Sequence, residues 1–480
     1  MWIGNGWRNI PPPFLLLPPL KGVRDGLILT ARVLILSGVV CLGACNAQAG
    51  FWSTGYYPAY EQSSMPASNI DFTALTDIIH FSVIPNTDGT LNSGENDLTP
   101  GNSADIVTHA HAAGRPVLLC VGGAGSESDF ELATTNATLS TFVSNLTNFM
   151  AARGYDGVDI DWEPLTVADG PQFTNLVYKL RSALNEFSQY KLLTVAAGAY
   201  PPYGDPPTAE YTMFAALQSQ FDQINIMTYD LSGPYEGWVT WFNSPIYDGG
   251  YRFPSSGALV PSVNGAVSNF VVNGVSPAKL GIGMAFYGDI WAGGSGTSTG
   301  GVTQPRQSWT VAPTMSNATY TAIMAGYYQS GLYHWDTDAQ AAYLGVTNAN
   351  PADDMFITYD DARTCQSKVS YARNQGLGGV MIWELAQDHQ SGQTDPLLLA
   401  VKQALATPGL ISIQSTGPDI ELSFASIPLG SYCVEWNSNL AGNVWNTLAV
   451  TNVSGTGGVL QVFDPDASEY ERFYRVQTPP

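Results

Sequence analysis

The sequence has few basic side chains. Lysine and arginine together number 18 among 480 residues, against 40 aspartates and glutamates, and the formal net charge is -22. A strongly acidic surface repels phosphate backbones and anionic lipid headgroups, so the composition argues against nucleic acids and membrane surfaces as partners. A neutral or cationic ligand is compatible with this charge, which also keeps an extracellular protein soluble.

Cysteine is scarce, with five residues in the chain. Those beyond residue 49 are Cys120, Cys365 and Cys433, and their wide separation predicts neither a disulfide framework nor a zinc site. His109 and His111 share a polar helix face, and we expect no carboxylate or thiol close enough to make them metal ligands. No glycine motif that binds phosphate or a dinucleotide stands between an expected strand and helix. We therefore expect neither a metal nor another cofactor.

Long apolar runs are also missing near the N-terminus. The run Val33–Leu42 has 10 residues, whereas a membrane-spanning helix needs about 20. Basic residues precede the run and the sequence Ala47-Gln48-Ala49 follows it, an order typical of an export signal. We predict that residues 1–49 form a leader and that the protein is secreted. Cys45 follows small residues, which leaves open a second interpretation, a lipoprotein attached to the cell surface through this cysteine.

Glycine and proline are abundant, at 49 and 31 residues, and 45% of the chain is hydrophobic, which is typical of a folded protein with many loops. From residue 50 to about 405, short β-branched runs alternate with amphipathic helical patterns, as in βα units around a parallel sheet. The expected strands are Trp52–Tyr57, Ile78–Ile84, Pro116–Val121, Gly157–Trp162, Leu192–Ala197, Gln223–Tyr229, Leu280–Phe286 and Gly379–Trp383. Eight βα units close a (β/α)8 TIM barrel, so the predicted fold class is α/β.

Two segments depart from this alternation. The seventh and eighth expected strands are separated by far more residues than one helix and its loops require, so we predict an inserted subdomain at about residues 291–354. After Pro408, short alternating strands separated by turn residues predict a small β-sandwich module over residues 408–480. The strands expected in this module are Ile420–Phe424, Tyr432–Asn437, Trp445–Thr451, Val459–Phe463 and Phe473–Val476.

The segment DGVDIDWE, residues 156–163, carries the most informative pattern. Alternate side chains of a strand face the same way, so Asp159, Asp161 and Glu163 share one face and three apolar residues share the other. In a barrel the acidic face lines the interior and leads to the C-terminal rim, where barrel active sites lie. Confinement disfavours ionising all three carboxyls, so at least one holds a proton near neutral pH and supplies a general acid. The alternative, a solvated acidic edge strand, does not require apolar residues on its back.

The same segment resembles the DxxDxDxE signature of glycoside hydrolase family 18 at every specified position, with Asp156 as its first acid. The resemblance implies a retaining mechanism in which the substrate's N-acetyl group assists cleavage. Glu163 is then the acid that protonates the glycosidic oxygen. Asp161 orients the acetamido N–H and stabilises the positively charged intermediate, and Asp159 modulates the shared proton. The implied function is a chitinase that hydrolyses β-1,4 bonds between N-acetylglucosamine units.

Other segments resemble the same family. In QINIMTYD, the resemblance makes Tyr229 the contact of the acetamido carbonyl and puts Met227 and Asp230 in the same subsite. In the later segment GGVMIWE, Trp383 is implied to form the apolar floor under the sugar, although a tryptophan considered alone is more often a core residue. Further substrate contacts implied by the resemblance are Tyr56, Gly123, Met284 and Tyr287.

The predicted insertion resembles the α+β subdomain of subfamily A chitinases, which forms one wall of a deep cleft and implies processive or exo-type cleavage. One position departs from the family pattern, because Cys120 stands where the third strand usually has serine. The C-terminal module resembles the fibronectin type III-like accessory modules of secreted enzymes. Its Trp436 and Trp445 form either a sugar-stacking platform or part of the module's core.

Two other functions remain open from the sequence. An endo-β-N-acetylglucosaminidase that acts on glycoprotein glycans has the same four acids, whereas the predicted insertion favours a chitinase. A non-hydrolytic chitin-binding lectin keeps this fold but typically loses the catalytic glutamate, and Glu163 is present. We expect a monomer that binds chitin or N-acetylglucosamine oligomers.

Overall fold

The computed structural model describes most of the chain beyond the predicted leader. The described residues are 50–199, 208–390, 392, 395–406, 410–426, 431–438, 445–452, 458–465, 467 and 472–477. The leader, residues 1–49 with Cys45, lies outside the described residues. Among the helices that are described, none is long and apolar enough to cross a membrane.

A closed barrel of parallel strands forms the main body. Its strands are β1 (Trp52–Pro58), β2 (Asp77–Pro85), β4 (Val117–Gly123), β5 (Gly157–Trp162), β6 (Leu192–Gly198), β7 (Gln223–Met227), β8 (Leu280–Ala285) and β14 (Gly379–Trp383). They follow the order β1-β14-β8-β7-β6-β5-β4-β2, and pairing of β1 with β2 closes the ring. The short β3 (Leu91–Asn92) extends β2 in antiparallel fashion. The predicted (β/α)8 TIM barrel is confirmed, and so is each of its expected strands, to within two residues at either end.

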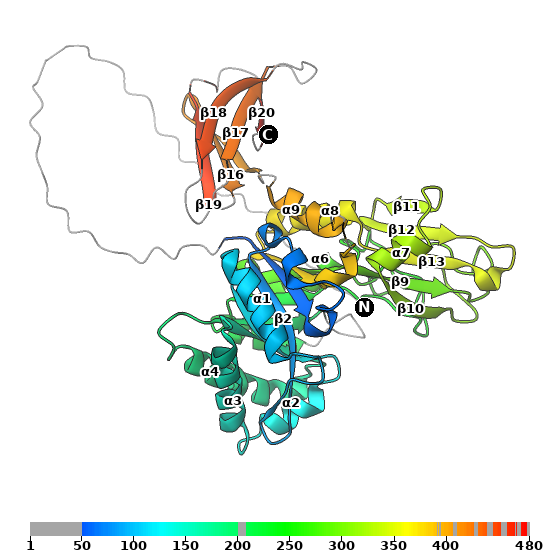
Figure 1. Ribbon diagram of the computed structural model, residues 1–480. Helices are drawn as coiled ribbons and strands as arrows, with labels where there is room; N and C mark the ends of the chain where they lie inside the picture. The colour runs from blue at the N-terminus through cyan, green and yellow to red at the C-terminus, as the bar shows by residue number, and fades with distance from the viewer. Residues whose placement is uncertain are drawn as a thin grey trace, which may run out of the picture. The chain divides into compact units, whose positions relative to one another are not determined.

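Helices connect most of the consecutive barrel strands, only 3-10 turns lie between β1 and β2, and α9 follows the last barrel strand (Figure 1). They are α1 (Pro100–Ala112), α2 (Glu127–Ala133), α3 (Leu139–Arg153), α4 (Gly170–Leu184), α5 (Thr208–Leu217), α6 (Val263–Val272), α8 (Ala362–Asn374) and α9 (Pro396–Ala406). Short 3-10 turns are η1 (Ala59–Glu61), η2 (Ala67–Asn69), η3 (Phe72–Ala74), η4 (Val167–Asp169), η5 (Pro277–Lys279), η6 (Pro351–Asp353) and η7 (Leu385–Asp388). Helix α1 begins where the Thr99 side chain accepts a hydrogen bond from the Asn102 N–H. Helix α3 ends at Gly154, whose φ of 78° suits a residue without a Cβ.

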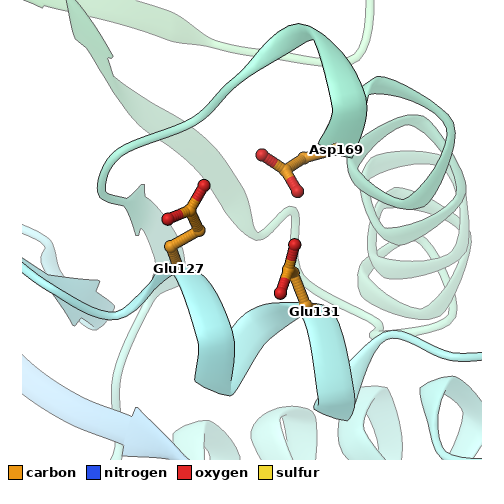
Figure 2. Close-up of side chains that lie close together, drawn as sticks. All are labelled: Glu127, Glu131 and Asp169. Atoms are coloured by element: carbon orange, nitrogen blue, oxygen red, sulfur yellow. The ribbon is translucent and has the colours of Figure 1, made fainter.

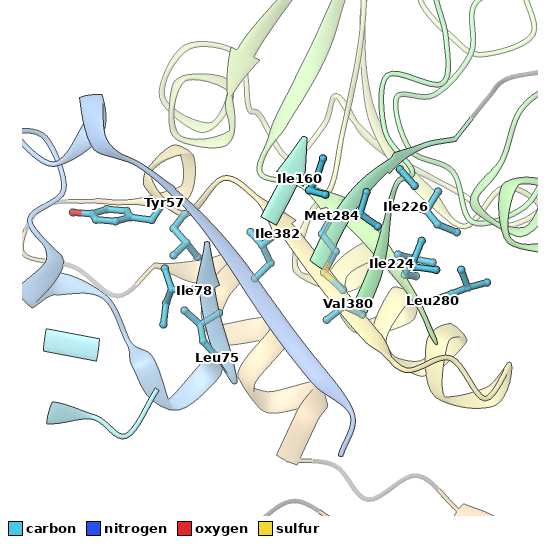
Figure 3. Packing of buried hydrophobic residues seen from close by; sticks show 14 of the residues in the cluster. Tyr57, Leu75, Ile78, Ile160, Ile224, Ile226, Leu280, Met284, Val380 and Ile382 are labelled. Carbon is cyan, nitrogen blue, oxygen red and sulfur yellow. The ribbon is translucent and has the colours of Figure 1, made fainter. Parts of the chain in front are cut away.

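The barrel strands divide their side chains between two apolar layers. Between the strands and the helices lies the larger core, to which Ile160, Ile226, Met284 and Ile382 belong (Figure 3). Inside the barrel a smaller apolar cluster contains Tyr56, Ile79, Phe81, Leu118, Cys120, Tyr229, Ala285, Tyr287 and Met381. The alternation of strand side chains thus places polar and aromatic residues at the barrel mouth, above a packed interior.

The insertion between β8 and β14 is an antiparallel sheet with one helix beside it (Figure 1). Its elements are β9 (Tyr287–Ala292), β10 (Thr314–Thr319), α7 (Tyr320–Gly326), β11 (Tyr333–Asp336), β12 (Ala341–Val346) and β13 (Met355–Tyr359). The sheet order is β10-β9-β13-β12-β11. The insertion therefore extends from 287 to 359, wider than the expected 291–354, because β9 starts directly after the seventh barrel strand.

The C-terminal module contains two three-stranded antiparallel sheets, β15-β16-β19 and β18-β17-β20. The strands are β15 (Leu410–Thr416), β16 (Asp419–Ser426), β17 (Ser431–Asn437), β18 (Asn446–Asn452), β19 (Gly458–Asp464) and β20 (Phe473–Gln477). Side chains of both sheets meet in one core, where Phe424 and Tyr432 lie 5.4 Å apart between ring centroids. The strand β15 was not among the expected strands.

Arginine side chains cover the two tryptophans of this module. The guanidinium of Arg472 lies 4.0 Å from the ring centroid of Trp436, and that of Arg475 lies 4.4 Å from Trp445. Each arginine also bonds to an acid, Asp464 and Glu435 respectively. One face of each indole is therefore occupied by a cation, which leaves less aromatic surface for a sugar than the platform hypothesis requires.

Candidate active site

Strand β5 carries the acidic face into the barrel. Asp159 and Asp161 are buried, at 0% and 3% exposure, while Glu163 follows the strand and is half-buried. On the opposite face, Trp162 stacks on Phe130 with 4.6 Å between ring centroids and an angle of 7° between the planes. The acids therefore line the barrel interior and its C-terminal rim, and the apolar residues between them pack under the helices.

Asp159 is held at the bottom of the acidic row by three donors. Tyr56 donates its hydroxyl at 2.8 Å and Thr194 at 2.6 Å, and the Cys120 thiol also donates to this carboxylate. Burial raises the pKa of Asp159 to about 6, although these hydrogen bonds oppose the rise. The predicted substrate contact Tyr56 thus acts on an acid of the site, since its hydroxyl points to Asp159.

Asp161 and Glu163 are hydrogen-bonded to each other. A hydrogen bond between two carboxyl groups requires a proton on one of them. Burial, followed by the charges of Glu163 and Asp159, raises the pKa of Asp161 well above its ordinary value. Burial also raises the pKa of Glu163. The pair therefore holds a proton to a higher pH than isolated carboxyl groups do. Oδ1 of Asp161 is buried without a hydrogen-bond partner in the described part of the chain.

A cavity of about 260 Å³ opens beside Glu163 at the ends of β5, β6 and β7. Its walls include Met227, Tyr229 and Asp230. Tyr287 donates its hydroxyl to Oδ1 of Asp230 at 2.7 Å, and its ring lies edge to face with that of Tyr229. The structure thus brings these four residues together with Glu163, as the sequence predicted. A larger groove of about 540 Å³ between α4 and α5 contains none of the predicted site residues, so the acids rather than the volume identify the candidate site.

Trp383 is half-buried at the barrel mouth and is held by two aromatic neighbours. Its ring centroid lies 5.0 Å from that of Phe81 and 5.5 Å from that of Tyr56. Gly123 makes this packing possible, because a Cβ at this position lies only 2.6 Å from Cζ of Phe81 and the backbone has a φ of 126°. Gly123 thus leaves room for the ring that supports Trp383, and its contact with substrate stays a prediction.

Met284 lies away from the site. Its side chain is fully buried in the core between barrel and helices, so the expectation that it contacts substrate is wrong (Figure 3). On β8 the inward positions are instead Gly281, Gly283 and Ala285. A Cβ on Gly281 lies 2.8 Å from the indole of Trp52, and one on Gly283 lies 2.6 Å from the ring of Tyr229. The small inward residues of β8 therefore make space for large aromatic side chains inside the barrel.

A family model described as glycosyl hydrolases family 18 matches residues 53–388, which include the whole barrel mouth. The chain belongs to glycoside hydrolase family 18.

Curated relatives and solved structures of family 18 are similar over most of this chain. Chitinase A1 of Niallia circulans is 30% identical over 71% of this chain and 48% of its own length, so the chain spans about half of that protein. Chitinase 1 of Aphanocladium album is 26% identical over 77% of this chain and 88% of its own length. The Group IV chitinase of Ostrinia furnacalis, solved with allosamidin, superposes with a TM-score of 0.63 at 21% identity. That match covers 74% of this chain and 99% of that one, and it shows the shared fold.

Asp156, the first acid of the family 18 signature, lies at the opposite end of β5 from the cavity. Its carboxylate accepts hydrogen bonds from the Val117 N–H at 2.9 Å and from Nε2 of His111 at 2.7 Å. His109 likewise approaches Asp105, with Nδ1 3.2 Å from a carboxylate oxygen. Both histidines therefore have a carboxylate neighbour, contrary to expectation, because Asp105 lies one turn before His109 on α1 and Asp156 directly precedes β5. Asp156 ties β5 to β4 and takes no part in the cavity.

A second acidic group lies on helix α2 and the turn η4, which follow β4 and β5. In Figure 2 the carboxylates of Glu127, Glu131 and Asp169 point toward one another, with ligand atoms within 4.8 Å. The group contains no histidine or cysteine, and an oxygen of Asp169 already accepts two hydrogen bonds from Thr166. Glu131 is exposed and Glu127 is half-buried, and acids near the surface often gather in this way without a metal, so we assign none to this group.

Thr194 is the residue of this family 18 site that sequence reasoning missed. It is buried on β6, and its hydroxyl provides the shortest hydrogen bond to Asp159. The signal was present, because Thr194 is a polar residue in the otherwise apolar strand LLTVAAG, directly beside Asp159 in the strand register. A polar residue at an inward position of a barrel strand indicates a partner inside the barrel.

Proposed function

We propose that this family 18 member is a chitinase that hydrolyses β-1,4 bonds between N-acetylglucosamine units with retention of configuration. The observation that carries the proposal is the hydrogen-bonded pair of Asp161 and Glu163, which keeps a proton beside an open cavity. Such a pair supplies a general acid at neutral pH and, after proton transfer, a general base in the same position.

In the first step, Glu163 gives its proton to the glycosidic oxygen. The carbonyl oxygen of the substrate's acetamido group forms a bond to C1 as the bond between C1 and the glycosidic oxygen breaks, so an oxazolinium ion results. The acetamido N–H donates to Asp161, which favours the ionised form of Asp161 and leaves the shared proton on Glu163. The negative charge of Asp161 then stabilises the positive ring.

In the second step, the Glu163 carboxylate takes a proton from a water molecule as the water oxygen bonds to C1. The bond between C1 and the acetamido oxygen breaks, the acetamido group is restored, and the product keeps the original configuration. Glu163 is again protonated at the end. Asp159, whose pKa is about 6, lies beneath the pair and adjusts how strongly Asp161 holds its proton.

The remaining cavity residues orient the sugar. Among the described residues, the Tyr229 hydroxyl donates a hydrogen bond only to the Sδ of Met381, at 3.8 Å, and a thioether is a weak acceptor. This hydroxyl is therefore available to donate to the acetamido carbonyl. Asp230, oriented by Tyr287, binds sugar or acetamido groups from the side, and Trp383 provides an apolar surface for the C–H face of the ring.

Chitin is the proposed substrate because the aromatic floor and acetamide-directed acids suit an N-acetylglucosamine chain, and because the relatives reported above are chitinases. We also propose that the insertion corresponds to the subfamily A subdomain and forms one wall of a cleft that favours processive or exo-type cleavage. The lectin hypothesis is disfavoured by the presence of Glu163, which a protein that only binds does not need.

Product analysis on chitohexaose, compared with a high-mannose glycoprotein, tests the function. A chitinase releases short N-acetylglucosamine oligomers from chitohexaose and leaves the glycoprotein intact. Release of the glycan with the hexamer untouched supports an endo-β-N-acetylglucosaminidase instead, and binding of the hexamer without products supports a lectin. The anomeric form of the first products, followed by NMR, distinguishes retention from inversion.

We further propose that the protein acts outside the cell as a monomer, after removal of a leader within residues 1–49. In that segment basic residues are followed by an apolar run and then by small residues, an order that supports export. Mass spectrometry of the mature N-terminus tests this. A start after Ala49 supports secretion, and a lipid-modified Cys45 supports surface attachment.

A further inference from the structure

A completely buried lysine lies behind the active site. Lys368, on α8, has 0% exposure, and three acceptors surround its ammonium group. They are Oδ2 of Asp360 at 2.5 Å, the Ser244 hydroxyl, and the carbonyl of Gly283 at 3.4 Å. An ammonium has three N–H groups, so each of them is directed to an acceptor. A buried ion pair adds little net stability, which raises the question of what this one holds in place.

Through Ser244, the lysine reaches the backbone at the end of β7. The Ser244 hydroxyl accepts from Lys368 and donates to the carbonyl of Thr228. The Thr228 hydroxyl in turn donates to the Gly283 carbonyl at 3.1 Å and accepts from the Gly283 N–H at 2.8 Å. Thr228 directly precedes Tyr229 and Asp230, so these bonds fix the backbone from which both cavity side chains extend.

Asn243, the residue before Ser244, binds the backbone of Asp230 and Leu231. Asn243 accepts from the Asp230 N–H through Oδ1 at 2.6 Å and from the Leu231 N–H through its carbonyl at 3.0 Å. Asp230 has a φ of 54°, a left-handed conformation that a residue with a side chain adopts only when neighbours hold it. The Asn243 N–H donates to the hydroxyl of Thr358, on β13 of the insertion, at 3.2 Å.

The two chain segments that join the barrel to the insertion lie next to Lys368. Asp360 follows β13, where the chain leaves the insertion, and its carboxylate accepts from the N–H of Ala285, where the chain enters it, at 3.3 Å. Gly283 belongs to the same barrel strand. Lys368 therefore joins the entry and exit of the insertion to the strand end that carries Tyr229.

We propose that Lys368 and Ser244 are positioning residues that hold Tyr229 and Asp230 in their catalytic geometry. The inference rests on the proposed function, because it assigns to Tyr229 the acetamido group of the substrate. Neither positioning residue lines the cavity, so their effect reaches the reaction through the Thr228 carbonyl. Loss of the Ser244 hydroxyl removes one of the bonds that set the direction of Tyr229, and small displacements of an orienting group lower the rate strongly.

Ser244→Ala tests the proposal, and Ser103→Ala is a matched control. Ser103 is also buried, and its hydroxyl likewise donates to a backbone carbonyl, that of Thr99, and accepts from a cation, Arg153. It accepts in addition from the Tyr155 hydroxyl. It lies on α1, away from the cavity. We expect Ser244→Ala to lower kcat on chitohexaose by about 10-fold with KM changed less than about 2-fold. Ser103→Ala loses a similar amount of thermal stability while kcat is kept.

The outcomes separate the two proposals. Equal kcat values for the two variants overturn the positioning role and leave the chitinase proposal standing. A wild-type protein that cleaves no chitohexaose contradicts the proposed function itself. If Ser244→Ala does not fold, Ser244→Cys replaces the hydroxyl by a weaker donor, and its kcat is expected to fall by about 3-fold. A kcat for Ser244→Cys equal to that of the wild type overturns the positioning role.

Discussion

Replacing Cys120 with serine tests how hydrogen bonds inside the barrel control the charge of Asp159. Burial raises the pKa of this carboxyl from 3.8 to about 6, while Thr194, Tyr56 and the Cys120 thiol donate to it and oppose the rise. Keeping the carboxylate ionised at neutral pH therefore destabilises the folded state by about 3 kcal/mol. A stronger donor at position 120 is expected to reduce this destabilisation.

The expected size follows from donor strength. A hydroxyl that donates to a charged group contributes about 1.5–3 kcal/mol, and a thiol is a weaker donor. The serine is therefore expected to favour ionised Asp159 by about 1 kcal/mol more than Cys120 does. Because the folded-state pKa of Asp159 lies above its unfolded value, the carboxyl favours folding at low pH, and this contribution is lost as the pH rises through about 6. Serine lowers the folded-state pKa and so reduces the loss.

Urea unfolding of the wild type, Cys120→Ser and Cys120→Ala at about pH 4.5 and about pH 7.5 provides the assay. From the lower to the higher pH, the free energy of unfolding of Cys120→Ser is expected to fall by about 1 kcal/mol less than that of the wild type. Cys120→Ala, which removes the donor, is expected to change in the opposite direction. Because the free energy of unfolding of each variant is compared between the two pH values, the effect of the substitution on packing cancels. The same pH response in all three proteins refutes the reasoning.

Three further predictions concern the packing at Gly123, the buried ion pair of Lys368 and Asp360, and the C-terminal module. Gly123→Ala is expected to destabilise the fold by about 3 kcal/mol and to raise KM, as measured by thermal unfolding and steady-state kinetics, because its Cβ displaces the ring beneath the sugar floor. Lys368→Met leaves Asp360 buried and unpaired and is expected to destabilise the fold by about 3–5 kcal/mol, most of which Asp360→Asn restores in the double variant. Trp436→Ala and Trp445→Ala are expected to lower thermal stability without changing binding to insoluble chitin, because arginines cover their rings; weaker binding contradicts this.

The barrel and the acidic row were predictable from local patterns. In β5 acids and large apolar residues alternate strictly, so both the strand and the direction of its side chains follow from the sequence. The Tyr229 and Asp230 pair followed from its motif, because β7 lies two strands from β5 in a parallel barrel of this order and inward side chains of alternate strands share one layer. Local periodicity and fixed topology together place residues that are far apart in sequence.

Other features depend on contacts that no local pattern reports. On β8 glycines alternate with apolar residues. This pattern predicts that Met284 is buried, but it does not indicate whether the side chain lies inside the barrel or between the strands and the helices. Gly123 matches a family pattern, but its role became clear only from its distance to Phe81. Lys368 bonds to Ser244 across 124 positions of sequence, and a single basic residue in a helix does not indicate that it is buried. These roles arise from tertiary packing.

Glu163→Gln tests the central claim most directly, because glutamine keeps the shape of the side chain and cannot donate a carboxylic proton. The measurement pairs hydrolysis of chitohexaose with its binding, followed by isothermal calorimetry at the same pH. We expect kcat to fall by at least about 100-fold while the hexamer still binds with a Kd within about 10-fold of the wild-type KM. A variant that retains near wild-type hydrolysis would contradict the assignment of Glu163 as the general acid.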